Sequence, residues 1–139
     1  MPSTTVLLAG ATGMLGGRIA HHLLDAEEVA LRLLVRSPVL ADPAKRSRLD
    51  RLVERGAEVV EGDVSDTASL GRATGGVDVV VSALQSEREV LVDGQVALAR
   101  AAAANGVRRM LPSDFALDLL KPRPASIRPS TCGARPAKP

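Results

Sequence analysis

Three glycines spaced three residues apart, Gly10, Gly13 and Gly16, follow an apolar run at residues 6–9. From Leu15 onward, the apolar residues recur with the period of a helix. A glycine-rich turn between a strand and a helix lets backbone N–H groups approach a phosphate, and the N-terminus of the helix adds partial positive charge. We therefore expect this turn to bind the pyrophosphate of a dinucleotide. The alternative is a tight turn that binds no ligand.

A cationic residue, Arg36, comes directly after the strand expected at residues 30–35. Dinucleotide folds that select NAD usually carry an acidic residue here, about 20 residues past the glycines, which binds the ribose 2′-hydroxyl. In this chain the next acidic residue is Asp42. Since a guanidinium matches the oxygens of a phosphate, we predict that Arg36 binds the 2′-phosphate of NADP, with help from Lys45 or Arg46. The alternative is a solvated surface arginine.

Further candidate residues follow two other expected strands. Asp63 and Val64 come after the strand at residues 57–61, and Ser82 and Gln85 come after the strand at residues 77–81. The carboxyl ends of the strands form the ligand-binding edge of an open α/β sheet. We therefore expect Asp63 or Val64 to contact the adenine.

Strands and helices alternate along the chain. Strands are expected at residues 4–9, 30–35, 57–61, 77–81 and 109–111, and helices at residues 14–25, 43–55, 67–73 and 89–105. Parallel strands need helical crossovers, and these crossovers are right-handed. The sequence therefore predicts an α/β, Rossmann-like, doubly wound parallel sheet with strand order 3-2-1-4-5. The cofactor should lie across the switch point between the first and fourth strands.

The apolar spacing also predicts which side chains face the core. On the helix at residues 43–55, the inward positions are expected to be Leu49, Leu52 and Val53. On the helix at residues 89–105, they are expected to be Val92, Val96, Ala99 and Ala103. Asp66 is the expected N-cap of the helix at residues 67–73.

The composition narrows the class of protein. The chain has 139 residues, of which 45% are hydrophobic and 1% aromatic, so we expect one domain with an aliphatic core. The single cysteine, Cys132, forms no internal disulfide, and the sequence shows neither a secretory leader nor a span for a membrane. We expect a cytoplasmic protein without a membrane partner. No nucleic-acid partner and no metal are expected, because acids interrupt the cations of residues 43–55 and the two histidines are adjacent.

Six motifs occur in order: G-A-T-G-M-L-G, L-V-R, G-D-V-S-D, V-S-A-L-Q, V-D-G-Q and P-S-D-F. Their combination resembles the NmrA-like, isoflavone-reductase-like group of atypical short-chain dehydrogenases/reductases, over residues 4–120. The resemblance implies the NAD(P)-binding half of such a protein. Complete relatives reduce small aromatic or phenylpropanoid-type substrates with NADPH, or sense the cofactor without turning it over.

The resemblance also implies roles for individual residues. The positions that match the pyrophosphate site are Gly10, Thr12, Gly13, Met14, Leu15 and Gly16, and the position that matches the 2′-phosphate site is Arg36. Those that would border the adenosine are Asp63, Ser82 and Gln85, and those that would border the nicotinamide are Ser113 and Phe115.

No catalytic residue is assigned. In the family, the catalytic lysine and the substrate domain follow the P-S-D-F segment, and neither Lys121 nor Lys138 matches a family motif. The chain has no tyrosine, so it also lacks the Tyr-x-x-x-Lys pair of ordinary short-chain dehydrogenases. We therefore expect a form truncated after the fifth strand, of uncertain catalytic competence. The alternatives are a cofactor-sensing module and a small reductase that borrows catalytic groups from a partner chain.

The composition changes after residue 120. Residues 121–139 are rich in proline and arginine, with five cationic residues and no acidic one. Such a segment buries too little apolar surface to offset its ordering entropy, so we expect residues 1–120 to form the domain and residues 121–139 a disordered tail. Three interpretations of the tail stay open: a solvated segment, a basic arm, and a product of a shifted reading frame, since a shifted frame can encode a segment that resembles the family's.

Overall fold

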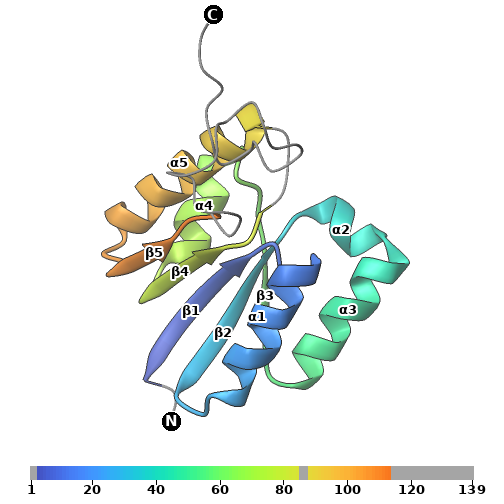
Figure 1. Cartoon of the computed structure of the whole chain (residues 1–139). Coiled ribbons are helices and arrows are strands. Elements are labelled where there is room, and N and C mark those ends of the chain that lie inside the picture. Colours follow the sequence, from blue (N-terminus) through green and yellow to red (C-terminus); the bar gives the residue numbers. More distant parts are fainter. Residues whose placement is uncertain (1–2, 85–87, 114–139) are drawn as a thin grey trace, which may run out of the picture.

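The computed structural model describes residues 3–84 and 88–113, which form a parallel sheet covered by helices on both faces (Figure 1). The strands are β1 (Thr4–Ala9), β2 (Val29–Val35), β3 (Glu58–Glu61), β4 (Val79–Ser82) and β5 (Arg109–Leu111). The helices are α1 (Met14–Asp25), α2 (Ser37–Ala41), α3 (Pro43–Glu54), α4 (Thr67–Thr74) and α5 (Arg88–Ala104). The strand order β3-β2-β1-β4-β5 confirms the predicted topology.

Strand β1 lies at the centre of the sheet and pairs in parallel with β2 and β4. Its residue Val6 is in register with Leu31 on one side and with Val79 on the other. At its carboxyl end, Ala9 is in register with Leu34 and Ser82. The carboxyl ends of β1, β2 and β4 therefore meet at one edge of the sheet, where the glycine turn begins.

Two apolar layers hold the helices to the sheet. Successive side chains of a strand point to opposite faces, so Leu8 packs into the layer with Leu49 and Leu52 of α3, and Leu7 packs into the layer with Leu98 of α5. Figure 1 shows α1, α2 and α3 over one face and α4 and α5 over the other. Both faces of the sheet are covered, which agrees with the unbroken apolar run at residues 6–9 of β1.

Aspartate caps begin two of these helices. Asp42 accepts hydrogen bonds from the backbone N–H groups of Ala44 and Lys45, at 3.0 and 3.3 Å, and Pro43 occupies the first turn of α3. Asp66 accepts from the backbone N–H groups of Ala68 and Ser69, which confirms its predicted role as the N-cap of α4. The cap of α3 fixes the start of the helix that supplies cations to the site.

The structure corrects the prediction for two helix faces. Val53 of α3 is 45% exposed, although Leu49 and Leu52 are buried as expected. On α5 the buried residues among those described are Leu91, Gly94, Leu98, Ala101 and Ala102, whereas Val92 is half-buried, Val96 is 44% exposed and Ala99 and Ala103 are also exposed. Alanines surround α5 on every side, so apolar spacing alone does not identify its inner face.

Helix α2 was not predicted. It occupies Ser37–Ala41, directly after β2, and has Pro38 in its first turn, which is a favourable position for proline. With five residues it is too short for apolar periodicity to reveal. Among the described residues, no helix combines the length and apolarity needed to cross a bilayer.

Candidate functional site

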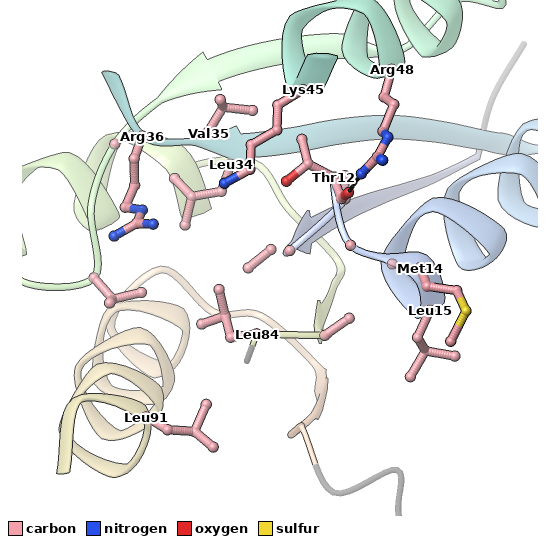
Figure 2. A pocket seen from close by; sticks show the side chains of 18 residues that line it. Thr12, Met14, Leu15, Leu34, Val35, Arg36, Lys45, Arg48, Leu84 and Leu91 are labelled. Carbon is pink, nitrogen blue, oxygen red and sulfur yellow. Dashed lines mark hydrogen bonds between the residues drawn. The ribbon is translucent and has the colours of Figure 1, made fainter. Parts of the chain in front are cut away.

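A cavity of about 380 Å³ opens at the carboxyl ends of β1, β2 and β4 (Figure 2). The residues that line it are 9–16, 34–36, 45, 48, 62, 64, 83, 84 and 91. The cavity thus includes the complete glycine turn, the end of β2 and two side chains of α3. It lies at the predicted switch point between β1 and β4.

Two glycines of the turn are required by packing. Gly10 has a φ of 90°, and a Cβ added to it would lie 2.5 Å from the carbonyl oxygen of Ala83. A Cβ added to Gly16 would lie 1.9 Å from the carbonyl oxygen of Gly10. The absence of side chains at these two positions therefore lets the turn pass close to the end of β4 and lets α1 pack against the turn.

The third glycine leaves space toward the cavity. Gly13 has a φ of −78°, which any residue can adopt, and a Cβ added to it would meet only the carbonyl oxygen of Gly10 within 4 Å, at 3.5 Å. Gly13 is also the N-cap residue of α1 and brings no capping side chain. The first N–H groups of a helix lack intrahelical partners, so this end of α1 can accept a phosphate. Thr12, Met14 and Leu15 line the same part of the cavity, and Met14 is 80% exposed.

Three cationic side chains line the cavity. Arg36 follows β2, and Lys45 and Arg48 lie on α3 (Figure 2). No aspartate or glutamate lines the described cavity. Of the two residues expected to assist Arg36, Lys45 lines the cavity, whereas Arg46 does not and instead pairs with Asp50 at 3.5 Å.

Arg48 was not predicted as a site residue. Its Nη1 donates a hydrogen bond to the carbonyl oxygen of Thr12 at 2.9 Å, which connects α3 to the glycine turn. The sequence carries a weak signal for this placement, because Arg48 follows Lys45 by three residues and so shares its face of the helix.

Asp63 lies next to the cavity without lining it, while its neighbours Gly62 and Val64 do line it. The carboxylate of Asp63 accepts hydrogen bonds from the backbone N–H and the hydroxyl of Ser65, both at 2.9 Å. The backbone bond is the main reason that the pKa of Asp63 lies below its usual value; partial burial opposes this, and the Ser65 hydroxyl and the charge of Arg36 add to it.

Helix α5 approaches Val64 closely. A Cβ added to Gly94 would lie 2.7 Å from Cγ2 of Val64. The glycine of the V-D-G-Q motif therefore allows α5 to pack against the loop that carries Gly62 and Val64. Through this contact, α5 helps to position one wall of the cavity.

The other predicted residues have different surroundings. Ser82 is fully buried and does not line the cavity, and its hydroxyl has no hydrogen-bond partner within the described ranges. Ser113 also lies outside the lining, but its hydroxyl donates to the carbonyl oxygen of the lining residue Leu84 at 2.7 Å. Its backbone N–H donates to Oε1 of Gln95. Gln85, Phe115 and residues 121–139 lie outside the described residues.

Known proteins share this arrangement. The model of the NmrA-like family matches residues 2–125. Among curated relatives, pinoresinol reductase 2 of Arabidopsis thaliana is 40% identical over 118 residues, which cover 83% of this chain and 37% of the relative. Phenylcoumaran benzylic ether reductase PT1 of Pinus taeda is 34% identical over 115 residues, which cover 82% of this chain and 36% of the relative. The chain thus spans little more than a third of these relatives.

Solved structures agree with the sequence matches. AtPrR2 with NADP+ and (+)-pinoresinol is 35% identical with a TM-score of 0.79, and the match covers 94% of this chain and 42% of that one. The binary complex of leucoanthocyanidin reductase from Vitis vinifera with NADPH is 32% identical with a TM-score of 0.76, and the match covers 90% and 40% of the two chains. Since the family model matches most of the sequence and the fold agrees, this chain belongs to the NmrA-like family.

Proposed function

We propose that this chain binds NADP(H) and forms the cofactor-binding portion of a reductase that acts on small aromatic substrates. The observation that carries the proposal is the position of Arg36, which lines the same cavity as the glycine turn. Its guanidinium stands where an NAD-selective fold places a carboxylate.

The charge of the cavity supports NADP over NAD. A phosphate monoester carries about −1.5 to −2 charges near neutral pH and offers three acceptor oxygens. Arg36, Lys45 and Arg48 supply cationic donors, and no carboxylate of the described lining competes for them. The 2′-phosphate of NADP would therefore be attracted, whereas NAD lacks the group that these cations bind.

The glycine turn fits the pyrophosphate that both cofactors share. The space beside Gly13 and the N-terminus of α1 accept a diphosphate through backbone N–H groups, without a requirement for a side chain. Met14 and Leu15 lie away from Arg36 in Figure 2 and line the cavity with apolar surface. This end of the cavity suits the nicotinamide and an adjacent aromatic substrate.

The proposal assigns no catalytic residue. A general acid must lie within hydrogen-bond reach of the reacting group; the described lining residues include no tyrosine, histidine or carboxylate, and the one lysine among them, Lys45, is assigned to the 2′-phosphate. The complexes of the related reductases with NADPH, and with NADP+ and pinoresinol, support the cofactor and the aromatic class of substrate. The role proposed for the described residues is to bind and orient the cofactor.

Titration with NADP+ and NAD+ tests the proposal. We expect NADP+ to bind more tightly by about tenfold or more, since a hydrogen bond between charged groups contributes about 1.5–3 kcal/mol. Arg36→Ala should weaken NADP+ and leave NAD+ nearly unchanged. Arg100→Ala, which removes an exposed cation of α5 outside the cavity, is the matched control and should change neither affinity. Equal losses for both cofactors in Arg36→Ala would overturn the assignment.

Turnover separates a reductase from a cofactor sensor. Oxidation of NADPH in the presence of pinoresinol or a related aromatic substrate would support the reductase. Binding of both NADP+ and NADPH with no oxidation would contradict a reductase activity of this chain by itself and would agree with a role limited to cofactor binding.

A further inference from the structure

The glycine turn holds the guanidinium of Arg48 at the edge of the cavity. Nη1 of Arg48 donates to the carbonyl oxygen of Thr12 at 2.9 Å, although the two residues are 36 positions apart in sequence. Figure 2 shows the side chain of Arg48 reaching from α3 to Thr12. A guanidinium has five N–H donors in a fixed planar arrangement, so this bond leaves donors for a ligand.

The two cations of α3 that line the cavity differ in their ion pairing from a neighbouring cation of the same helix. Lys45 and Arg48 are three residues apart and share one face of α3. Among the side chains that the structure describes, the ion pairs involve neither of them, nor Arg36. Arg46, by contrast, pairs with Asp50 at 3.5 Å. Cations beside a cavity whose described lining residues include no carboxylate are placed to attract an anion.

We infer that Arg48 is a specificity-determining residue, which attracts the 2′-phosphate of NADP from the side of the cavity opposite to Arg36, with Lys45 between them in Figure 2. This inference rests on the proposed NADP(H) site. We assign Arg48 to the 2′-phosphate rather than to the pyrophosphate because the two groups differ in charge and in the donors that they need. The backbone N–H groups of the turn serve the pyrophosphate, whereas a phosphate monoester, with up to two charges and three oxygens, needs several cationic donors.

The bond to Thr12 prepares Arg48 for this role. A free arginine side chain loses much rotational freedom when it binds a ligand, and this loss weakens binding. Because the carbonyl oxygen of Thr12 already holds Nη1, less freedom is lost when the phosphate arrives. The same bond ties the position of the guanidinium to the position of the glycine turn, and therefore to the phosphates bound there.

Two ligands that differ in a single phosphate test the inference. The full chain is titrated calorimetrically with 2′,5′-ADP and with 5′-AMP. In Arg48→Ala, we expect the affinity for 2′,5′-ADP to fall about tenfold or more, while the affinity for 5′-AMP stays unchanged. The matched control is Arg51→Ala, which removes an exposed cation of the same helix outside the cavity and should leave both affinities unchanged.

Two further variants distinguish charge from structural support. Arg48→Gln removes the charge but keeps a polar side chain with N–H donors, so it should lose affinity for 2′,5′-ADP like Arg48→Ala. Arg48→Lys keeps the charge without the planar fork and should fall between these variants and the native chain. Circular dichroism of each variant checks that the fold is retained.

The outcomes separate this inference from the proposal on which it rests. If the native chain does not prefer 2′,5′-ADP to 5′-AMP, the NADP(H) site itself is wrong. If the native chain shows the preference and loses it in Arg36→Ala but keeps it in Arg48→Ala, the inference about Arg48 alone is overturned. The inference would also be overturned if Arg48→Ala lost affinity for 2′,5′-ADP and 5′-AMP equally while Arg48→Gln retained its affinity for 2′,5′-ADP. Arg48 would then serve only to support the turn.

Discussion

The carbonyl oxygen of Gly10 lies so close to Gly16 that a Cβ added to Gly16 would be 1.9 Å from it. At Gly13, midway between them, an added Cβ would be 3.5 Å from the same oxygen, which is an ordinary contact. The glycines of one motif therefore have separate roles. Gly16 allows α1 to pack against the turn, and Gly13 leaves space at the cavity.

This difference predicts that a substitution at Gly16 affects mainly stability, whereas one at Gly13 affects mainly cofactor binding. Gly16→Ala should destabilise the fold by about 1–3 kcal/mol or more, because α1 must move away from the turn. Gly13→Val should keep the far-UV circular dichroism but abolish binding of either dinucleotide, since its side chain would fill the space for the pyrophosphate. Chemical denaturation and cofactor titration measure the two effects.

A third glycine provides the control for these variants. An alanine at Gly71, inside α4, would meet nothing within 4 Å, so Gly71→Ala should stabilise the protein by about 0.5–1 kcal/mol. If Gly16→Ala is as stable as the native chain, the close approach of α1 is not essential. Binding retained by a folded Gly13→Val variant would place the phosphates elsewhere.

The sequence predicted the topology because local signals agreed with the buried pattern. The apolar run of β1, the glycine turn and the N-cap at Asp66 each have a local cause, and each is found as predicted. The inner face of α5 was predicted wrongly because alanine contributes apolar surface on every side of this helix. There the packing of Leu98 in the sheet layer, a tertiary effect, determines which residues are buried.

The site was predictable where one residue type suits one position. The glycines stood out because a tight turn with close backbone approach requires them. Arg36 stood out because it places a positive charge where NAD-selective folds have an acidic residue. Arg48 did not stand out, since its contact with Thr12 joins residues 36 positions apart and its spacing from Lys45 is only a weak local signal. Asp63 was the predicted adenosine residue and Val64 only an alternative for the adenine contact, and the fold shows that Val64 lines the cavity while Asp63 does not.

The hydrogen bonds to Asp63 predict a dependence of stability on acid. Since the pKa of Asp63 in the folded state is lowered, chiefly by the backbone N–H of Ser65, the ionised carboxylate stabilises the fold above its usual pKa of 3.8. This stabilisation is lost as the pH falls through the lowered value. Asp63→Asn should therefore reduce the loss of stability on acidification, measured by urea denaturation between about pH 7 and pH 2.

Ser65→Ala is the companion variant for Asp63. It removes the hydroxyl donor but keeps the backbone N–H, which is the larger cause of the lowered pKa. Its acid dependence should lie closer to that of the native chain than to that of Asp63→Asn. The same acid dependence in Asp63→Asn and in the native chain would show that another group governs it.

Gln95 of α5 and Ser113, two residues past β5, connect one end of the sheet to the cavity wall. Oε1 of Gln95 accepts from the backbone N–H of Ser113, and the Ser113 hydroxyl donates to the carbonyl oxygen of Leu84 at 2.7 Å. Leu84 lines the cavity. We therefore expect Gln95 to position the segment that is predicted to border the nicotinamide.

Gln95→Leu removes the acceptor for the Ser113 amide and should weaken NADP+ about fivefold, since a typical hydrogen bond contributes about 1 kcal/mol. Its affinity for 2′,5′-ADP, which lacks the nicotinamide, should not change. Gln95→Glu keeps an acceptor oxygen at the same position and should bind both ligands more nearly as the native chain does. Parallel titrations with the two ligands measure this difference. A local displacement of Ser113 and of its contact with Leu84 should weaken only the ligand that carries the nicotinamide. An equal loss of affinity for NADP+ and 2′,5′-ADP would instead mean that Gln95 supports the whole domain.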